Sequence, residues 1–132
     1  MSIYACTMLE KGRSEMVDML KALADETRLR MFSLIVQGDL CVCEIEACLE
    51  ITQSNASRHL NTLKKAGILD NYKIAQWTYY KISEEFIKDN QELYIYLNKK
   101  MKESYLYQKD REALRICKAK ELCGCKNNKE EM

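Results

Sequence analysis

The segment 39–82 constrains the fold of this chain more than any other part of the sequence. Ile45 and Leu49, one helical turn apart, predict a short helix that begins within 41–44. After a brief polar break, a second amphipathic pattern runs over 54–66. Two helices joined by a tight polar turn form a helix-turn-helix, the motif that places its second helix in the major groove of DNA.

Two β-rich runs follow the second helix. Residues 68–73 and 77–82 are enriched in β-branched and aromatic side chains and are separated by residues 74–76. We therefore expect a β-hairpin, and the fold class is α+β, mainly α: a winged helix-turn-helix with a two-stranded wing. Three aromatic side chains of the second run are expected to pack or pair across the strands: Trp77, Tyr79 and Tyr80.

Helices are also predicted before this segment. Apolar residues recur at helical spacing over 14–24, and a further helix begins at Glu26. Asp25 is expected to cap that helix, and Gly38 to end it in a left-handed conformation. The following pair of helices then has either Thr52 or Gln53 at the start of its second member.

The C-terminal part is expected to contain one long helix and one short helix. Ser83 caps the long helix, which is predicted to extend to about Tyr105, and the short helix covers 110–120. The charged stretch 122–132 is expected to be a mobile tail. The chain is accordingly divided into an N-terminal arm, a winged-helix and dimerisation domain, and a C-terminal helix with its tail: residues 1–13, 14–102 and 103–132.

Length and charge fit a single DNA-binding domain. The chain has 132 residues and a formal net charge of +1, yet residues 52–82 contain five Lys or Arg and one Asp, a local charge of +4. A basic segment inside a neutral chain predicts a positioned contact with a polyanion, whereas its alternative is a solvated basic surface. No apolar run is long enough to span a membrane, and no secretory signal is apparent, so we expect a cytoplasmic protein.

Three stretches of the sequence resemble the ArsR/SmtB family of metal-sensing repressors. They are LKALADETRLR (20–30), LCVCEI (40–45) and QSNASRHLNTLKKAGIL (53–69). The resemblance covers roughly residues 14 to 100 with the hairpin included. It implies a homodimer formed by the N-terminal and long fifth helices, which binds double-stranded operator DNA when free and releases it when an inducer binds. It implies no enzymatic activity.

The resemblance also assigns the DNA contacts. Arg58 is the strongest candidate, because a guanidinium makes bidentate contacts with guanine or phosphate. His59, the only histidine, is expected to be a hydrogen-bonded structural residue rather than a metal ligand. The positions that match family DNA contacts are Gln53, Ser54, Ser57 and Arg58 on the recognition helix, and Lys73 and Gln76 on the wing. Lys64 is added as a residue expected to neutralise backbone charge. The wing departs from many relatives, because its tip lacks their glycine and arginine.

The cysteines carry the strongest chemical signal. Seven cysteines are an odd number, and a Cys-x-Cys pair makes a poor disulfide, so we expect reduced thiols that bind a metal. Cys41 and Cys43 match the Cys-Val-Cys motif of the arsenic and cadmium/lead branches of the family. Thiolates favour thiophilic ions, and the fifth helix lacks the histidine of zinc-sensing relatives.

Trivalent arsenic binds three thiolates, so a third cysteine is required. One branch has it three residues after the motif, where this chain has Glu46. Cys48 lies about 140° around the helix from Cys43 and is expected to pack in the core. Cys6 on the arm is the preferred third ligand, and a single arm cysteine favours arsenic or antimony over cadmium or lead. Three C-terminal cysteines are able in principle to supply a second thiol site or to complete the first: Cys117, Cys123 and Cys125.

Two alternatives remain open from the sequence. The first is a repressor of the same fold whose cysteines sense oxidants or persulfides. The second is a cysteine-rich metal buffer or thiol enzyme that does not bind DNA. No Cys/His/Asp catalytic set is visible, and the recognition-helix pattern and the basic segment argue against the second alternative.

Overall fold

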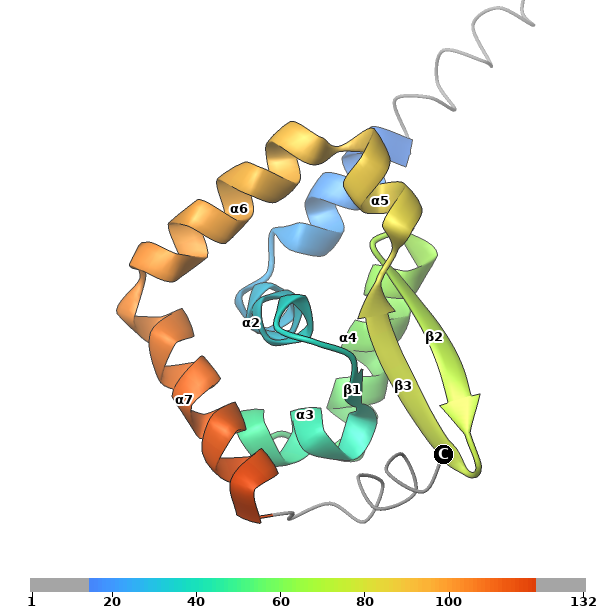
Figure 1. Ribbon diagram of the computed structural model, residues 1–132. Coiled ribbons are helices and arrows are strands. Elements are labelled where there is room, and N and C mark those ends of the chain that lie inside the picture. Colours follow the sequence, from blue (N-terminus) through green and yellow to red (C-terminus); the bar gives the residue numbers. More distant parts are fainter. Residues whose placement is uncertain (1–14, 121–132) are drawn as a thin grey trace, which may run out of the picture.

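The computed structural model describes residues 15–120, which form helices around one small sheet (Figure 1). The arm 1–13 and the stretch 122–132 lie outside the described residues. A helix over 15–23 is followed by α2 (Glu26–Val36), β1 (Leu40–Cys41), α3 (Val42–Leu49), α4 (Gln53–Lys65), β2 (Leu69–Ile74), β3 (Trp77–Ile82), α5 (Glu84–Asp89), α6 (Gln91–Glu103) and α7 (Tyr105–Lys120). Among these helices, none is long and apolar enough to cross a membrane.

The ends of α2 and α4 follow from local sequence. Asp25 accepts a hydrogen bond from the Arg28 N–H at 2.9 Å, and Thr52 accepts one from the Asn55 N–H at 3.2 Å, so both predicted caps are confirmed. Gly67 ends α4 with φ 80°, and the Gly67 and Ile68 N–H groups donate to carbonyls of the last turn. Gly38 follows the C-cap of α2 as predicted, with a positive φ of 156°, a conformation that favours glycine but differs from the left-handed helical value.

The predicted two-stranded wing is confirmed as the hairpin of β2 and β3. A short strand that was not predicted, β1, extends it to a three-stranded antiparallel sheet of order β1-β3-β2. In the added strand, Leu40 pairs with Tyr80 and Cys41 with Tyr79. Two residues are too few to show a strand period in the sequence. The hairpin loop is also shorter than expected, because Ile74 pairs with Trp77 and leaves a two-residue turn.

The predicted long C-terminal helix is interrupted. Asn90 has φ −132° and ψ 44°, which separates α5 from α6, and its side-chain amide donates to the Phe86 carbonyl at 3.2 Å. An asparagine side chain that bonds nearby backbone competes with helical hydrogen bonds in this way. Ser83 caps α5 as predicted. The last helix is longer than expected, since it begins at Tyr105 instead of residue 110.

One continuous core joins the helix-turn-helix to both C-terminal helices. Phe32 of α2 meets the rings of Phe86 and Tyr94 edge to face, at centroid distances of 6.1 and 6.2 Å. From α7, Leu114 is buried in the same cluster. Arg30 of α2 donates twice to the carboxylate of the buried Asp110, at 2.8 and 2.9 Å. The C-terminal helix therefore closes the core against α2 and α3 (Figure 1).

Candidate nucleic-acid interface and thiol site

The recognition helix α4 has one apolar face and one polar face. Ala56, Leu60 and Leu63 are fully buried and fix the helix against the core. The opposite face leaves its polar side chains in solvent, where they can reach base edges and phosphates. All seven residues assigned to DNA contact are exposed: Gln53, Ser54, Ser57, Arg58, Lys64, Lys73 and Gln76.

His59 lies at the edge of α4 and bonds to the preceding helices. The Arg28 guanidinium donates to His59 Nδ1 at 3.2 Å and to the Ala22 carbonyl at 2.6 Å, so one arginine links the N-terminal helix, α2 and α4. Burial lowers the pKa of His59, and the nearby Arg58 and Arg28 lower it further, against an opposing contribution from Asp25. The expected hydrogen-bonded structural role of His59 is confirmed.

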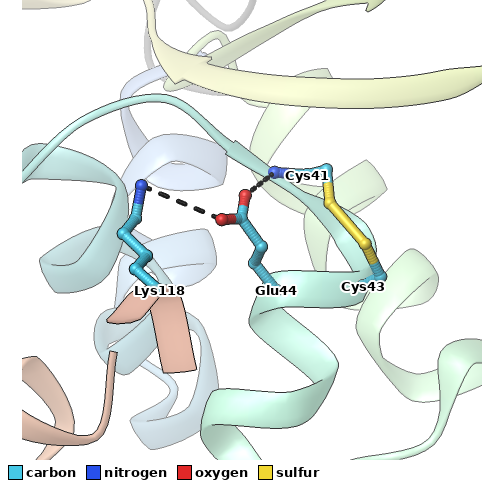
Figure 2. The surroundings of a disulfide bond; sticks show 4 residues. All are labelled: Cys41, Cys43, Glu44 and Lys118. Atoms are coloured by element: carbon cyan, nitrogen blue, oxygen red, sulfur yellow. Dashed lines mark hydrogen bonds and ion pairs between the residues drawn. A yellow bond between two sulfur atoms is a disulfide. The ribbon is translucent and has the colours of Figure 1, made fainter. Parts of the chain in front are cut away.

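The cysteine pair lies where β1 becomes α3. Cys41 is the N-cap of α3 and is fully buried, while Cys43 in the first turn is partly exposed. The structure joins their sulfur atoms in a disulfide (Figure 2), so the expectation of reduced thiols is wrong for this state. Residues two apart can form this bond here because Cys41 is still extended and only Cys43 is helical.

Glu44 and Lys118 support the pair from the side opposite the sulfur atoms (Figure 2). The buried Glu44 carboxylate accepts a hydrogen bond from the Cys41 N–H at 3.0 Å. Its second oxygen is 3.8 Å from Nζ of Lys118 on α7. Sequence reasoning missed both residues. The spacing of an N-cap residue and a Glu three positions later is a capping-box signal that could have identified Glu44, whereas Lys118 approaches only through tertiary packing.

Aromatic side chains of the wing cover the cysteine pair. Cys41 and Tyr79 form a small buried cluster, against which Cys43, Tyr72 and Trp77 pack. The rings of Tyr72 and Tyr79 stack at 5.6 Å with an interplanar angle of 14°. The predicted packing of the wing aromatics is thus confirmed. Within the described part of the chain, the buried indole nitrogen of Trp77 has no hydrogen-bond partner.

A cleft of about 310 Å³ connects the cysteines to the recognition helix. Cys41 and Cys43 line one wall. The other walls include Gln53 and Ser57 from the start of α4 and Gln76 from the wing tip. Three residues assigned to DNA and the two assigned to the inducer therefore share one cavity.

The other two cysteines of the described residues, Cys48 and Cys117, do not line this cavity. Cys48 is buried in the main core, and its thiol donates to the Asp110 carbonyl at 3.4 Å. Burial raises the pKa of Cys48 to about 12, with further contributions from Cys117 and Asp110, so it stays a thiol at neutral pH. The predicted core role of Cys48 is confirmed.

No third thiol ligand is visible in the described chain. Cys117 on α7 is a partly exposed free thiol. Cys6, Cys123 and Cys125 lie outside the described residues. Over 15–120, no three side chains of the metal-binding types come together.

The fold and the exposed polar helix define a winged helix-turn-helix protein. Residues 25–71 match the family model described as "Bacterial regulatory protein, arsR family". The chain is 35% identical over 80 residues to the transcriptional activator HlyU of Vibrio cholerae, covering 61% of this chain and 74% of that protein. The chain belongs to the ArsR family of bacterial regulatory proteins.

Two further relatives are named as regulators of arsenic or cadmium resistance. The arsenic resistance transcriptional regulator ArsR1 of Pseudomonas putida is 50% identical over 66 residues, which are 49% of this chain and 52% of that regulator. The chain thus spans about half the length of this relative. A cadmium resistance regulatory protein CadC homolog of Staphylococcus aureus is 35% identical over 82 residues, 61% of this chain and 68% of that protein. These relatives are transcriptional regulators, not enzymes.

Solved structures share the fold. The HlyU structure from Vibrio cholerae superposes with a TM-score of 0.57 at 35% identity and covers 67% of this chain and 96% of that one. The winged helix-turn-helix domain of Mb0332 from Mycobacterium bovis is described as homodimeric and DNA-binding. It superposes with a TM-score of 0.60 at 25% identity and covers 74% of this chain and 86% of that one.

Proposed function

We propose that the chain is a homodimeric, cytoplasmic transcriptional repressor that binds operator DNA when free and releases it when trivalent arsenic or antimony binds its cysteine thiolates. One observation carries the proposal: Cys41 and Cys43 line the same cleft as Gln53, Ser57 and Gln76. An inducer bound by the two sulfur atoms is thereby placed beside side chains proposed to contact DNA. The names of the arsenic resistance relatives support the same inducer class.

DNA binding rests on the polar face of α4. Arg58 is proposed to contact a guanine or a phosphate, and Lys64 to neutralise backbone charge. Gln53, Ser54 and Ser57 lie on the same exposed face, with Lys73 and Gln76 on the wing. Because such contacts release counterions from the duplex, operator affinity is expected to fall as salt rises.

Inducer binding requires the reduced pair. Cys41 and Cys43 supply two soft thiolates, and Cys6 is proposed as the third. Three thiolates suit trivalent arsenic or antimony, so cadmium or lead is the less favoured inducer, although cadmium resistance regulators are among the relatives. The C-terminal thiols Cys117, Cys123 and Cys125 are the alternative source of a third ligand or a second site.

Release of DNA follows from linkage between the two ligands. Inducer in the cleft fixes the start of α3 and alters its packing against the start of α4. If the two binding events disfavour one another, the coupling is reciprocal and typically worth about 1 to 3 kcal/mol. The free repressor then binds its operator, and the loaded repressor dissociates.

Substitution of the pair tests this proposal. Reduced Cys41→Ser and Cys43→Ser proteins are expected to bind operator DNA with ordinary affinity and to keep it after arsenite is added, because serine retains the approximate volume and loses the thiolate. Fluorescence anisotropy of a labelled operator measures both steps. Cys48→Ser is the matched control and should respond to arsenite. If Cys41→Ser and Cys43→Ser both respond, the site is elsewhere.

The disulfide favours a second candidate, a redox-sensing repressor. Oxidation would use the same two sulfur atoms and the same cleft. Under this alternative, the oxidised and reduced wild-type proteins differ in operator affinity with no metalloid present. Equal affinities of the two forms would eliminate it. The metal-buffer alternative is not supported, because the chain belongs to a family of regulators.

Exposed apolar side chains support a dimer. Met16, Val17 and Leu20 on the N-terminal helix and Ile95 and Tyr96 on α6 are all exposed in the single chain. An apolar face of this kind favours a protein partner. We propose that a second copy covers it, in line with the homodimeric description of the Mb0332 domain.

A further inference from the structure

We propose that a second cleft, between α2, α6 and α7, binds a phosphate group, either as the free anion or as part of a small phosphorylated molecule. This cleft has a volume of about 330 Å³ and lies where α6 turns into α7 beside α2 (Figure 1). It shares no lining residue with the cleft of the cysteine pair. The inference therefore goes beyond the proposed function and does not depend on it.

A buried hydroxyl without a partner marks this second cleft. Ser33 of α2 lines it and is only 1% exposed, and within residues 15–120 its Oγ atom forms no hydrogen bond. A buried hydroxyl that has lost its bonds to water without replacing them costs free energy. A ligand oxygen in the cleft would accept a hydrogen bond from Ser33. The ligand is therefore polar and has an acceptor.

Two cations give the second cleft its charge. Lys102 of α6 and Arg111 of α7 line it, and among the described residues neither forms an ion pair. No Asp or Glu of the described chain lines the cleft. Arg111 donates from Nη1 to the Met101 carbonyl at 3.4 Å, which holds the guanidinium beside the cleft. The charge of the lining residues therefore favours an anion.

The helix ends at the second cleft oppose an anion, but by less than the two cations favour it. Both α2 and α6 end there, and a helix C-terminus carries a partial charge of about −0.5. Two such ends amount to about −1, against two full positive charges from Lys102 and Arg111. The local charge is thus positive before a ligand binds.

Polar groups approach the second cleft from three elements. Ser33 and Gln37 come from α2 and its C-cap, Asn98 and Lys102 from α6, and Arg111 from α7. A tetrahedral phosphate presents oxygens in several directions and can accept from all three sides, whereas a planar carboxylate presents two oxygens. Arginine and lysine are also the side chains that bind phosphate most often.

The size of the second cleft suits a phosphate with or without a short organic group. Its volume is at the lower end of the range for small-molecule sites. Val36 and Met101 add apolar surface to walls that are otherwise polar. A phosphate at the cations leaves these two side chains for the carbon atoms of a small phosphate ester.

Calorimetric titration of the full chain tests the site, with inorganic phosphate and glycerol 3-phosphate as the two probes and ionic strength held constant. We expect one bound phosphate group per chain. Tighter binding of glycerol 3-phosphate would identify the ligand as a phosphate ester, and tighter binding of inorganic phosphate would identify it as the free anion. Absence of binding by either probe, or equally tight binding of acetate, would overturn the inference.

Charge variants locate the bound phosphate. Lys102 is exposed and forms no ion pair within the described chain, so Lys102→Ala should retain the fold. It should weaken binding of both probes by about tenfold or more, because a charge-assisted hydrogen bond is lost. Lys109→Ala is the matched control, since Lys109 is an exposed cation of α7 that does not line the cleft. Equal losses in the two variants would show that phosphate binds through general charge, and would overturn the site.

Ser33→Ala separates ligand binding from a structural role. Without phosphate, this variant should unfold at the same temperature as the wild type or higher, because the hydroxyl it removes is buried and unpaired. With saturating phosphate, the wild type should gain stability by binding, and Ser33→Ala should gain less. Thermal unfolding with and without phosphate measures both. An equal gain in the two proteins would remove Ser33 from the site and overturn the inference.

Discussion

Arg58 is the side chain on which sequence-specific binding should depend most. It is exposed on α4, and its guanidinium donates a hydrogen bond to Oδ1 of Asn55 at 3.1 Å. Arg58→Ala should therefore leave the fold intact and weaken operator binding by about 1 to 3 kcal/mol, the usual range for a base-contacting arginine. Titration of a labelled operator measures the change. Lys109→Ala, an exposed cation on α7, is the control, and equal effects of the two variants would remove the assignment of α4 as the recognition helix.

His59 should make stability depend on pH. Burial, together with Arg58 and Arg28, lowers its pKa below the ordinary value of 6.5 in the folded state. The unfolded chain therefore binds the proton more readily, and stability decreases as pH falls from 6.5 toward the lower folded pKa, then levels off. Urea unfolding at several pH values measures this loss. His59→Asn retains an acceptor for Arg28 without a titrating ring, so its stability should fall less over the same interval; parallel curves would contradict the prediction.

At the scale of elements, α7 should stabilise the fold through one buried ion pair. Asp110 is only 3% exposed and receives two hydrogen bonds from Arg30, while its carbonyl accepts from Cys48. Asp110→Asn should lower the free energy of unfolding by about 3 kcal/mol, because removal of one partner leaves a largely buried charge uncompensated. Chemical denaturation measures the difference. Glu112→Gln removes an exposed ion pair with Arg115 and should leave the denaturant midpoint of unfolding unchanged. If both variants lose the same free energy of unfolding, the buried Asp110 pair stabilises the fold no more than an exposed pair does.

The elements that could be predicted were those with local signals. The helix α4 has a capping threonine, an apolar stripe and Gly67 at its end, and each signal depends only on neighbouring residues. The strand β1 has two residues, and it exists because Leu40 and Cys41 meet β3 across the fold. The break at Asn90 was missed because the apolar period continues on both sides of it. Tertiary contact decides such features, so periodicity alone does not reveal them.

The candidate site also has one part that local sequence predicts and one part that tertiary contacts create. The exposed positions of α4 follow from the helical period, so the DNA face could be read from the sequence. The cleft could not, because it brings α3, α4 and the wing tip together around Trp77. The Cys41–Cys43 disulfide was also unexpected, because a Cys-x-Cys pair is ordinarily a poor disulfide. The two residues can be joined here because Cys41 is extended and Cys43 is helical.

At the scale of the whole molecule, the proposed inducer and DNA surfaces are adjacent on each chain, whereas the proposed dimer surface lies elsewhere. The cleft is formed by α3, α4 and the wing. The exposed apolar residues of the proposed interface belong to the N-terminal helix and α6. Figure 1 shows α6 on the far side of α2 from the wing. Under the proposed function, inducer binding would therefore need no dissociation of the dimer, and local displacement of α4 would be sufficient for release of DNA.

Disruption of the α6 surface should produce a folded monomer that binds the operator poorly. Ile95 is 66% exposed in the single chain, so Ile95→Asp creates no buried charge in the monomer and should retain the helical circular dichroism of the wild type. In a dimer the same substitution would bury a carboxylate among apolar side chains, which opposes association. A repressor dimer uses two recognition helices on two half-sites, so a monomer should lose most of its affinity. Sedimentation equilibrium measures the mass, and operator titration measures the affinity.

Tyr105→Asp is the matched control, because Tyr105 is 77% exposed but lies on α7, outside the proposed interface. If Ile95→Asp remains dimeric while Tyr105→Asp dissociates, α7 rather than α6 forms the interface.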